Sequence, residues 1–168
     1  MSVQDGTYHI VQANVARGRA PLTDPVMRGF VEQLDYINSV ADRAPGFVWR
    51  LQTDDGDATA IRVFDDPLMI FNMSVWESVE QLYEFVFRSE HLGPVKDRRA
   101  WFTKMDRPHS VLWWTPAGRL PTVTEAEQKL VLLHERGPSP AAFTFAELFD
   151  SAGRPIGRGS RMDRECGV

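Results

Sequence analysis

The segment from Phe71 to Trp76 constrains the fold most strongly, because it alternates between two kinds of side chain. A β-strand sends successive side chains to opposite faces of its sheet. One set is apolar and consists of Phe71, Met73 and Val75. The other set consists of two polar residues and a tryptophan, namely Asn72, Ser74 and Trp76. The apolar set requires a core, whereas the second set suits a pocket wall or a subunit interface. We therefore expect the protein to act at the second face.

The overall composition is that of one ordinary globular domain, with 168 residues, of which 43% are hydrophobic and 25% charged. The net charge of -4 provides no basic surface for nucleic acid or for an anionic membrane. No apolar run approaches the ~20 residues that span a bilayer. Residues 1–6 lack the basic and apolar regions of a secretory signal, and a single cysteine, Cys166, excludes an internal disulfide. We expect a cytoplasmic protein with no nucleic-acid or membrane partner.

The rest of the chain alternates between strand patterns and helix patterns. We expect strands over residues 7–15, 47–52, 59–64, 68–76 and 110–115, and helices over 24–43, 78–91 and 94–105. Asp24-Pro25 is a typical helix start, and Ser78 followed by Gln81 forms a capping box. This order of elements predicts an α+β fold, namely a ferredoxin-like split βαβ sandwich with an antiparallel sheet.

The first strand also has two distinct faces. We expect its mostly apolar set to lie beneath the helices: His9, Val11, Ala13 and Val15. Gln12 and Asn14 are then left on the open face, together with Trp76. Such a face would expose more apolar surface than a monomer normally does. It must be covered by a second subunit, by the C-terminal segment, or by both, and we expect a homodimer.

A C-terminal appendage begins at about residue 117. We expect a helix that Gly137-Pro138 ends, followed by an extended piece from Phe143 to Phe145 that docks through its aromatic rings. From about residue 150 the chain is rich in glycine, arginine and serine, which predicts disorder. The sequence therefore predicts one ferredoxin-like domain over residues 7–149 and a disordered tail over 150–168.

Several segments together resemble a bacterial family known only as a domain of unknown function. They are Tyr8-His9 with Asn14, Ala20-Pro21-Leu22 with Asp24-Pro25-Val26-Met27, Gly46 to Gln52, Asn72 to Ser78, and Gly137 to Pro140 with Ala142 to Phe145. The likeness covers roughly residues 7–149. That family is similar to the dimeric α/β-barrel superfamily, which includes antibiotic-biosynthesis monooxygenases, and the resemblance implies a homodimer with a central cavity. Because one fold hosts many chemistries, it implies the fold more firmly than the reaction.

The resemblance also implies roles for three residues. Haem-degrading members of the superfamily use an asparagine, a tryptophan and a haem-ligating histidine on elements that here carry Asn14, Trp76 and His91. His91 departs from their spacing, since it lies well past the start of its helix. Cofactor-free monooxygenases of the superfamily use an asparagine and a tryptophan to hold a phenolic substrate. Only the histidine therefore discriminates between a haem protein and a cofactor-free enzyme.

Other residues of the same face are candidates for binding a substrate. The polar groups are Gln12, Asn14, Asn72 and Ser74, which can orient a carbonyl or phenol and stabilise negative charge. Alternatively, they hydrogen-bond across a dimer or to trapped water. Trp76 is either a stacking wall for a planar ligand or an interface anchor. Trp113 and Trp114 point to opposite faces, so at least one of them should reach the cavity.

His91 is either a general base or axial ligand, or a surface histidine at a helix end. The four histidines have no carboxylate at ligand spacing, so we expect no metal site. The leading hypothesis is a small-molecule enzyme that resembles antibiotic-biosynthesis monooxygenases, either a cofactor-independent monooxygenase or a related isomerase or cyclase, and that acts on a planar aromatic or polyketide-like substrate. Asn14, Trp76 and His91 would be catalytic. The alternatives are a haem-binding or haem-degrading protein, and a non-catalytic ligand-binding or stress-response dimer.

Overall fold

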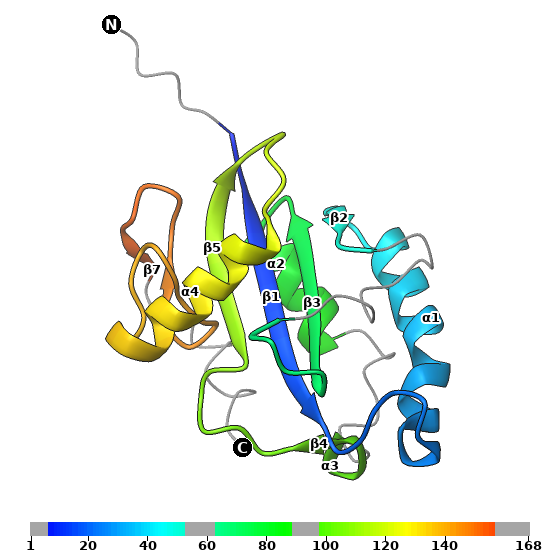
Figure 1. Cartoon of the computed structure of the whole chain (residues 1–168). Coiled ribbons are helices and arrows are strands. Elements are labelled where there is room, and N and C mark those ends of the chain that lie inside the picture. Colours follow the sequence, from blue (N-terminus) through cyan, green and yellow to red (C-terminus); the bar gives the residue numbers. More distant parts are fainter. Residues whose placement is uncertain (1–6, 53–62, 89–97, 157–168) are drawn as a thin grey trace, which may run out of the picture.

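An antiparallel sheet centred on strand β1 (Tyr8–Gly18) organises the molecule (Figure 1). The computed structural model describes residues 7–52, 63–88 and 98–156. The main strands follow the order β2-β3-β1-β5, with β2 at Phe47–Arg50, β3 at Met69–Trp76 and β5 at Ser110–Pro116. A short strand, β4 (Phe102–Thr103), pairs with the last two residues of β1. This strand order is that of the ferredoxin-like fold, so the predicted α+β class is confirmed.

The helices connect these strands in the expected alternation. Between β1 and β2 lie a 3₁₀ turn, η1 (Pro25–Met27), and helix α1 (Arg28–Arg43). After β3 come α2 (Val79–Tyr83) and a π-helical turn, η2 (Glu84–Arg88). The chain continues through α3 (Arg98–Trp101), α4 (Val123–Arg136) and a two-stranded ribbon of β6 (Leu148–Phe149) and β7 (Pro155–Ile156).

Short polar side chains start these helices as the sequence predicted. Asp24 accepts a hydrogen bond from the backbone N–H of Val26 at 2.9 Å. Ser78 accepts one from the N–H of Gln81 at 3.2 Å, and its hydroxyl lies 2.9 Å from Oε1 of the same glutamine. Each bond satisfies a backbone donor that has no partner within its own helix. The starts of α2 and of η1, which leads into α1, are therefore encoded locally.

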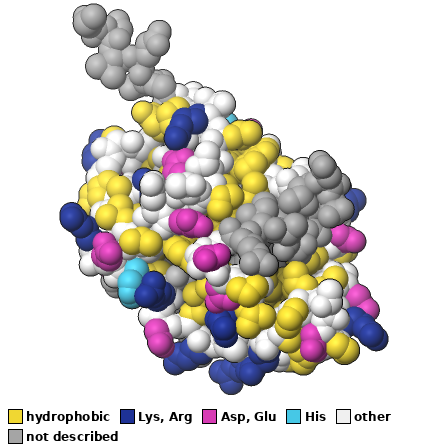
Figure 2. Space-filling view, in the orientation of Figure 1, with side chains coloured by type: hydrophobic (Ala, Val, Ile, Leu, Met, Phe, Trp, Pro, Cys, Tyr) yellow, Lys and Arg dark blue, Asp and Glu magenta, His cyan; other side chains and the backbone are white. Residues whose placement is uncertain are grey.

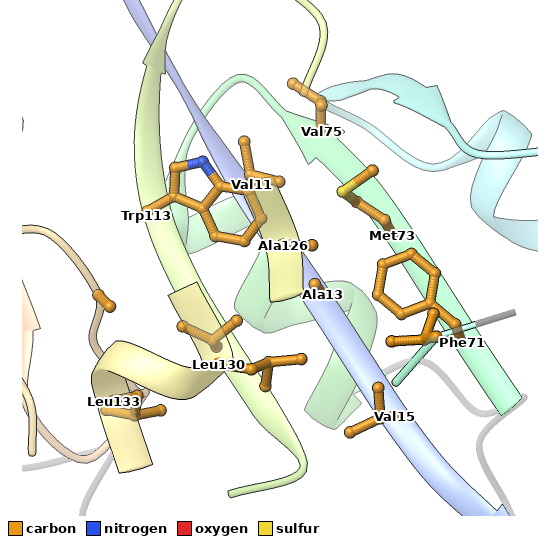
Figure 3. Packing of buried hydrophobic residues seen from close by; sticks show 13 residues of the cluster. Val11, Ala13, Val15, Phe71, Met73, Val75, Trp113, Ala126, Leu130 and Leu133 are labelled. Carbon is orange, nitrogen blue, oxygen red and sulfur yellow. The ribbon is translucent and has the colours of Figure 1, made fainter. Parts of the chain in front are cut away.

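One sheet face carries the larger core, and α4 covers it (Figure 3). The strands supply Val11, Ala13, Val15, Phe71, Met73, Val75, Val111 and Trp113, all no more than 2% exposed. Ala126, Leu130 and Leu133 of α4 pack against them. In Figure 1, α4 accordingly crosses the front of the sheet, while α2 lies behind it. The C-terminal segment thus covers a face that the sequence analysis assigned to the helices between the strands.

The opposite sheet face lies beneath α2, which corrects the predicted assignment of faces. Here Ile10, Trp76 and Leu112 pack against Val79 and Leu82 of α2. Trp76 was expected on an open face, and the apolar set of β1 was expected beneath the intervening helices. Alternation separated the two sets correctly, but it did not specify which layer covers which set.

Three predicted segments differ from the structure. The helix expected over residues 94–105 is shorter, since Phe102 and Thr103 belong to β4. Strand β2 pairs directly with β3, and most of the expected strand over 59–64 lies outside the described residues. Residues 150–156, predicted to be disordered, form the turn and second strand of the β6-β7 ribbon, where Asp150 caps the turn through the N–H groups of Ala152 and Arg154.

Candidate functional site

Two rows of polar residues lie side by side on the sheet face beneath α2. In the pairing of β1 with β3, Gln12 is opposite Ser74 and Asn14 is opposite Asn72. Directly opposed residues of an antiparallel pair share a face, with Cβ atoms about 5 Å apart. We call these four residues the polar strip. The structure therefore brings together four of the residues that the sequence selected for substrate binding or catalysis.

The strip runs from an open end to a buried end. Asn72 is exposed and Asn14 is half-buried. Gln12 is only 6% exposed, and its carboxamide has no hydrogen bond to any described residue. Within the described part of the chain, no buried side-chain nitrogen or oxygen is both sealed from solvent and unbonded. The carboxamide of Gln12 therefore borders a space that water or a ligand can enter, because buried polar groups are normally paired.

Trp76 lies at the buried end and is fully enclosed. Its exposure is 0%, and its ring stacks on Phe85 with centroids 4.9 Å apart. Phe47 meets it edge to face at 5.5 Å. The indole N–H donates to Oγ of Ser74 at 2.9 Å. In this conformation Trp76 is a core residue next to the strip and not a free wall for a planar ligand.

Arg50 of β2 extends the strip to a third strand, and sequence reasoning missed it. Arg50 is the register partner of Ser74 and lies on the same face. Its side chain is 14% exposed and pairs with Asp42 of α1, with Nε 2.7 Å from Oδ1. A charged residue between two apolar residues of a strand, Trp49 and Leu51, was the available signal. The strip is thus bordered by a cation whose charge Asp42 balances.

The remaining predicted site residues do not all join the strip. Trp113 lies on the opposite face, where its indole N–H donates to Oε1 of Glu125 at 3.2 Å. Trp114 packs against the smaller core beneath α2 and donates to the carbonyl of Phe149 at 2.8 Å. Of the tryptophan pair, Trp114 therefore shares the face of the strip. His91 lies outside the described residues.

The polar strip itself has no titratable side chain, so its hydrogen-bonding groups are neutral amides and a hydroxyl. Among the described residues, no three side chains of histidine, cysteine, aspartate or glutamate gather to hold a metal ion. Of the three residues that the resemblance linked to haem, Trp76 is enclosed between Phe47 and Phe85, and Asn14 lies in the polar strip. No helix of the described chain has both the length and the apolar character needed to cross a membrane.

The fold has a distant structural resemblance to monooxygenases of antibiotic biosynthesis. SnoaB, a cofactor-independent oxygenase from Streptomyces nogalater, is 16% identical, with a TM-score of 0.43 over 67% of this chain and 95% of SnoaB. A candidate antibiotic biosynthesis monooxygenase from Nitrosomonas europaea is 18% identical, with a TM-score of 0.42 over 73% of this chain and 99% of its own. A similar candidate from Chloroflexus aurantiacus is 16% identical, with a TM-score of 0.37 over 68% of this chain and 98% of its own.

The sequence itself gives a more extensive match. No curated protein matches the chain. The sequence profile of the Domain of unknown function (DUF3291) matches residues 9–158, which include all four residues of the polar strip and the whole of α4. The predicted likeness to a family of unknown function is therefore confirmed, and this chain belongs to the DUF3291 family.

Proposed function

We propose that the polar strip binds a planar aromatic or polyketide-like small molecule, on which the protein acts as a cofactor-independent monooxygenase. The observation that carries this proposal is the register of β1 with β3, which sets the carboxamides of Asn14 and Asn72 opposite each other at the accessible end of the strip. Neither carboxamide has a hydrogen bond to a described residue. Both therefore have donors and acceptors to offer a ligand.

The neutral character of the strip supports a ligand that carries carbonyl or phenol groups. A carboxamide provides two N–H donors and one acceptor oxygen, so two of them can hold a phenol and a neighbouring carbonyl at the same time. The rings of Phe85 and Phe47 lie at the buried end and add apolar surface beside the polar groups. A few placed polar groups beside apolar and aromatic side chains are typical of small-molecule sites.

The chemistry that such a strip favours is the stabilisation of negative charge on a substrate oxygen. An anthrone, for example, has a methylene group next to its aromatic rings, and loss of one proton to water gives an enolate. N–H donors from Asn14 and Asn72 lower the free energy of that enolate oxygen. The enolate then reduces molecular oxygen, the methylene becomes a carbonyl, and the second oxygen atom leaves as water. The protein contributes orientation and charge stabilisation, and the substrate contributes the electrons.

The test is oxygen uptake with 1,8-dihydroxyanthrone as the probe. We expect saturable uptake of one O₂ for each anthrone converted to the anthraquinone. Replacement of Asn14 or Asn72 by leucine should lower the turnover number by about 10²-fold, the usual effect of removing one donor to a developing oxyanion. Thermal unfolding of each variant would establish that the fold is retained.

A matched control is Gln128→Leu, which removes a carboxamide from the exposed surface of α4. Its turnover should equal that of the unsubstituted protein. Saturable binding of the anthrone without oxygen uptake would contradict the monooxygenase and support the non-catalytic ligand-binding protein. If the Asn14 and Asn72 variants retained full turnover, the strip would not be the site of the reaction.

A further inference from the structure

The hydrogen bond between Trp76 and Ser74 fixes the direction in which Ser74 can donate. The indole N–H of Trp76 has its acceptor in Oγ of Ser74, 2.9 Å away. A hydroxyl that accepts from one group keeps its own proton for another. Phe85 stacks on the indole and Phe47 packs against it edge to face, so the ring cannot turn away. The proton of Ser74 is therefore directed away from the indole.

A second donor lies beside Ser74 on the neighbouring strand. Gln12 is the cross-strand partner of Ser74, and such partners have Cβ atoms about 5 Å apart. Gln12 is 6% exposed, yet its carboxamide has no hydrogen bond to a described residue. Apart from the bond from Trp76, the Ser74 hydroxyl likewise has none among the residues that the structure describes. Two donors thus lie side by side without an acceptor.

We propose that the hydroxyl of Ser74 and the N–H₂ group of Gln12 form a donor pair that binds one ligand oxygen, a carbonyl or phenolate oxygen, and that Trp76 is the positioning residue of this pair. This inference rests on the proposed function, since the ligand is the one that the polar strip binds. Two donors that converge on one oxygen favour its negatively charged form. No carboxylate belongs to the strip, so nothing within it opposes that charge.

The role of Trp76 differs from the one that the sequence suggested. Its enclosed ring has no face for a ligand, and its contribution passes through the hydroxyl of Ser74. Phenylalanine at this position would keep most of the packing but remove the N–H. Ser74 could then turn its proton in other directions, and the donor pair would lose part of its alignment.

The experiment is a pH titration of bound 4-nitrophenol, followed by the visible absorption of its phenolate. In the unsubstituted protein we expect the pKa of the bound phenol to lie about one unit below that of the free phenol, because hydrogen bonds to the charged form stabilise it. Ser74→Ala and Gln12→Leu should each remove a large part of this shift. Trp76→Phe should remove a smaller part, and the Ser74→Ala/Trp76→Phe double variant should match Ser74→Ala alone.

Ser39→Ala is the matched control, since it removes a hydroxyl on α1 that donates to the carbonyl of Tyr36 at 2.7 Å. Its bound phenol should titrate as in the unsubstituted protein. If the pKa of the bound phenol is unshifted, or if Ser74→Ala does not change the shift, the donor-pair proposal is wrong. The strip would then still be a binding site. Absence of saturable 4-nitrophenol binding would count against both proposals. Should Trp76→Phe fail to fold, the Ser74 and Gln12 variants still decide whether the donor pair exists.

Discussion

The carboxylate of Asp42 on α1 accepts two hydrogen bonds from the guanidinium of Arg50 on β2, at 2.7 Å from Nε and 3.3 Å from Nη2. Arg50 is the strip's neighbour on β2, and α1 follows the sheet along that edge strand (Figure 1). This two-point ion pair therefore joins the helix to the strand beside the candidate site. The pair is half-buried, since Asp42 is 44% exposed and Arg50 only 14%.

Asp42→Ala should destabilise the protein by about 1 kcal/mol, because it removes a two-point ion pair and leaves the more buried partner with less compensation. Urea unfolding measures this change. Asp35→Ala is the control, because Asp35 is an exposed aspartate of the same helix. Equal stabilities of the two variants would show that the pair contributes nothing to the docking of α1.

Gly46→Ala should lower the free energy of unfolding by about 2–4 kcal/mol. Gly46 has a φ of 82°, a conformation that costs an L-residue about 1–2 kcal/mol. An added Cβ would also collide with the side chain of Gln81, the residue whose side chain contacts Ser78 at the start of α2. Gly118→Ala is a matched control, because its φ is 89° but no atom lies within 4 Å of the added Cβ. The difference between the two free energies of unfolding isolates the clash from the backbone strain.

Leu130→Ala should destabilise the protein by about 2–5 kcal/mol, the usual range for a buried leucine. Leu130 is 4% exposed and packs from α4 onto the large core. The neighbouring Val131 is 39% exposed, so Val131→Ala should change the free energy of unfolding by about 0.5 kcal/mol or less. Similar values for both variants, measured by urea unfolding, would indicate that α4 is not packed on the sheet in solution.

Asp66 should make the free energy of unfolding depend on pH in acid. Its carboxylate accepts hydrogen bonds from the backbone N–H of Leu68 and from Arg17, and these hold the pKa of Asp66 below its ordinary value of 3.8. A lowered pKa in the folded state stabilises the fold above the ordinary pKa, and this contribution is lost as the pH falls below it. Asp66→Asn should therefore flatten the decline of stability below about pH 4. Urea unfolding at a series of acidic pH values measures this decline, and an unchanged slope in the Asp66→Asn variant would contradict the prediction.

Local features of the fold were predictable because they depend on neighbouring residues. The cap of α2 requires only Ser78 and Gln81, and the strand at Met69–Trp76 follows from its own alternation. The layer that covers each sheet face depends instead on contacts distant in sequence. Leu130 and Val11 belong to one core only because α4 packs back onto the sheet, and no pattern within either segment specifies that.

The shared face of the polar strip was predictable from the sequence, but the surroundings of its residues were not. Alternation placed Gln12, Asn14, Asn72 and Ser74 on one face, and the strand register confirms that arrangement. Arg50 was not among the predicted site residues, because a bulge between Phe47 and Trp49 shifts the alternation of side chains along β2. Residues 47 and 50 therefore share a face although an uninterrupted strand would separate them. The enclosure of Trp76 depends on Phe85, which η2 supplies from beyond the strand.

Helix α4 has a consequence for how the protein behaves on dilution. Because α4 belongs to the same chain as the apolar sheet face that it covers, the burial of that face is independent of protein concentration. On the side shown in Figure 2, hydrophobic side chains are accordingly interspersed with charged and polar ones. The homodimer predicted from the sequence would have to use other surfaces. Loss of α4 would instead expose this apolar face to solvent, and an exposed apolar face of that kind favours aggregation.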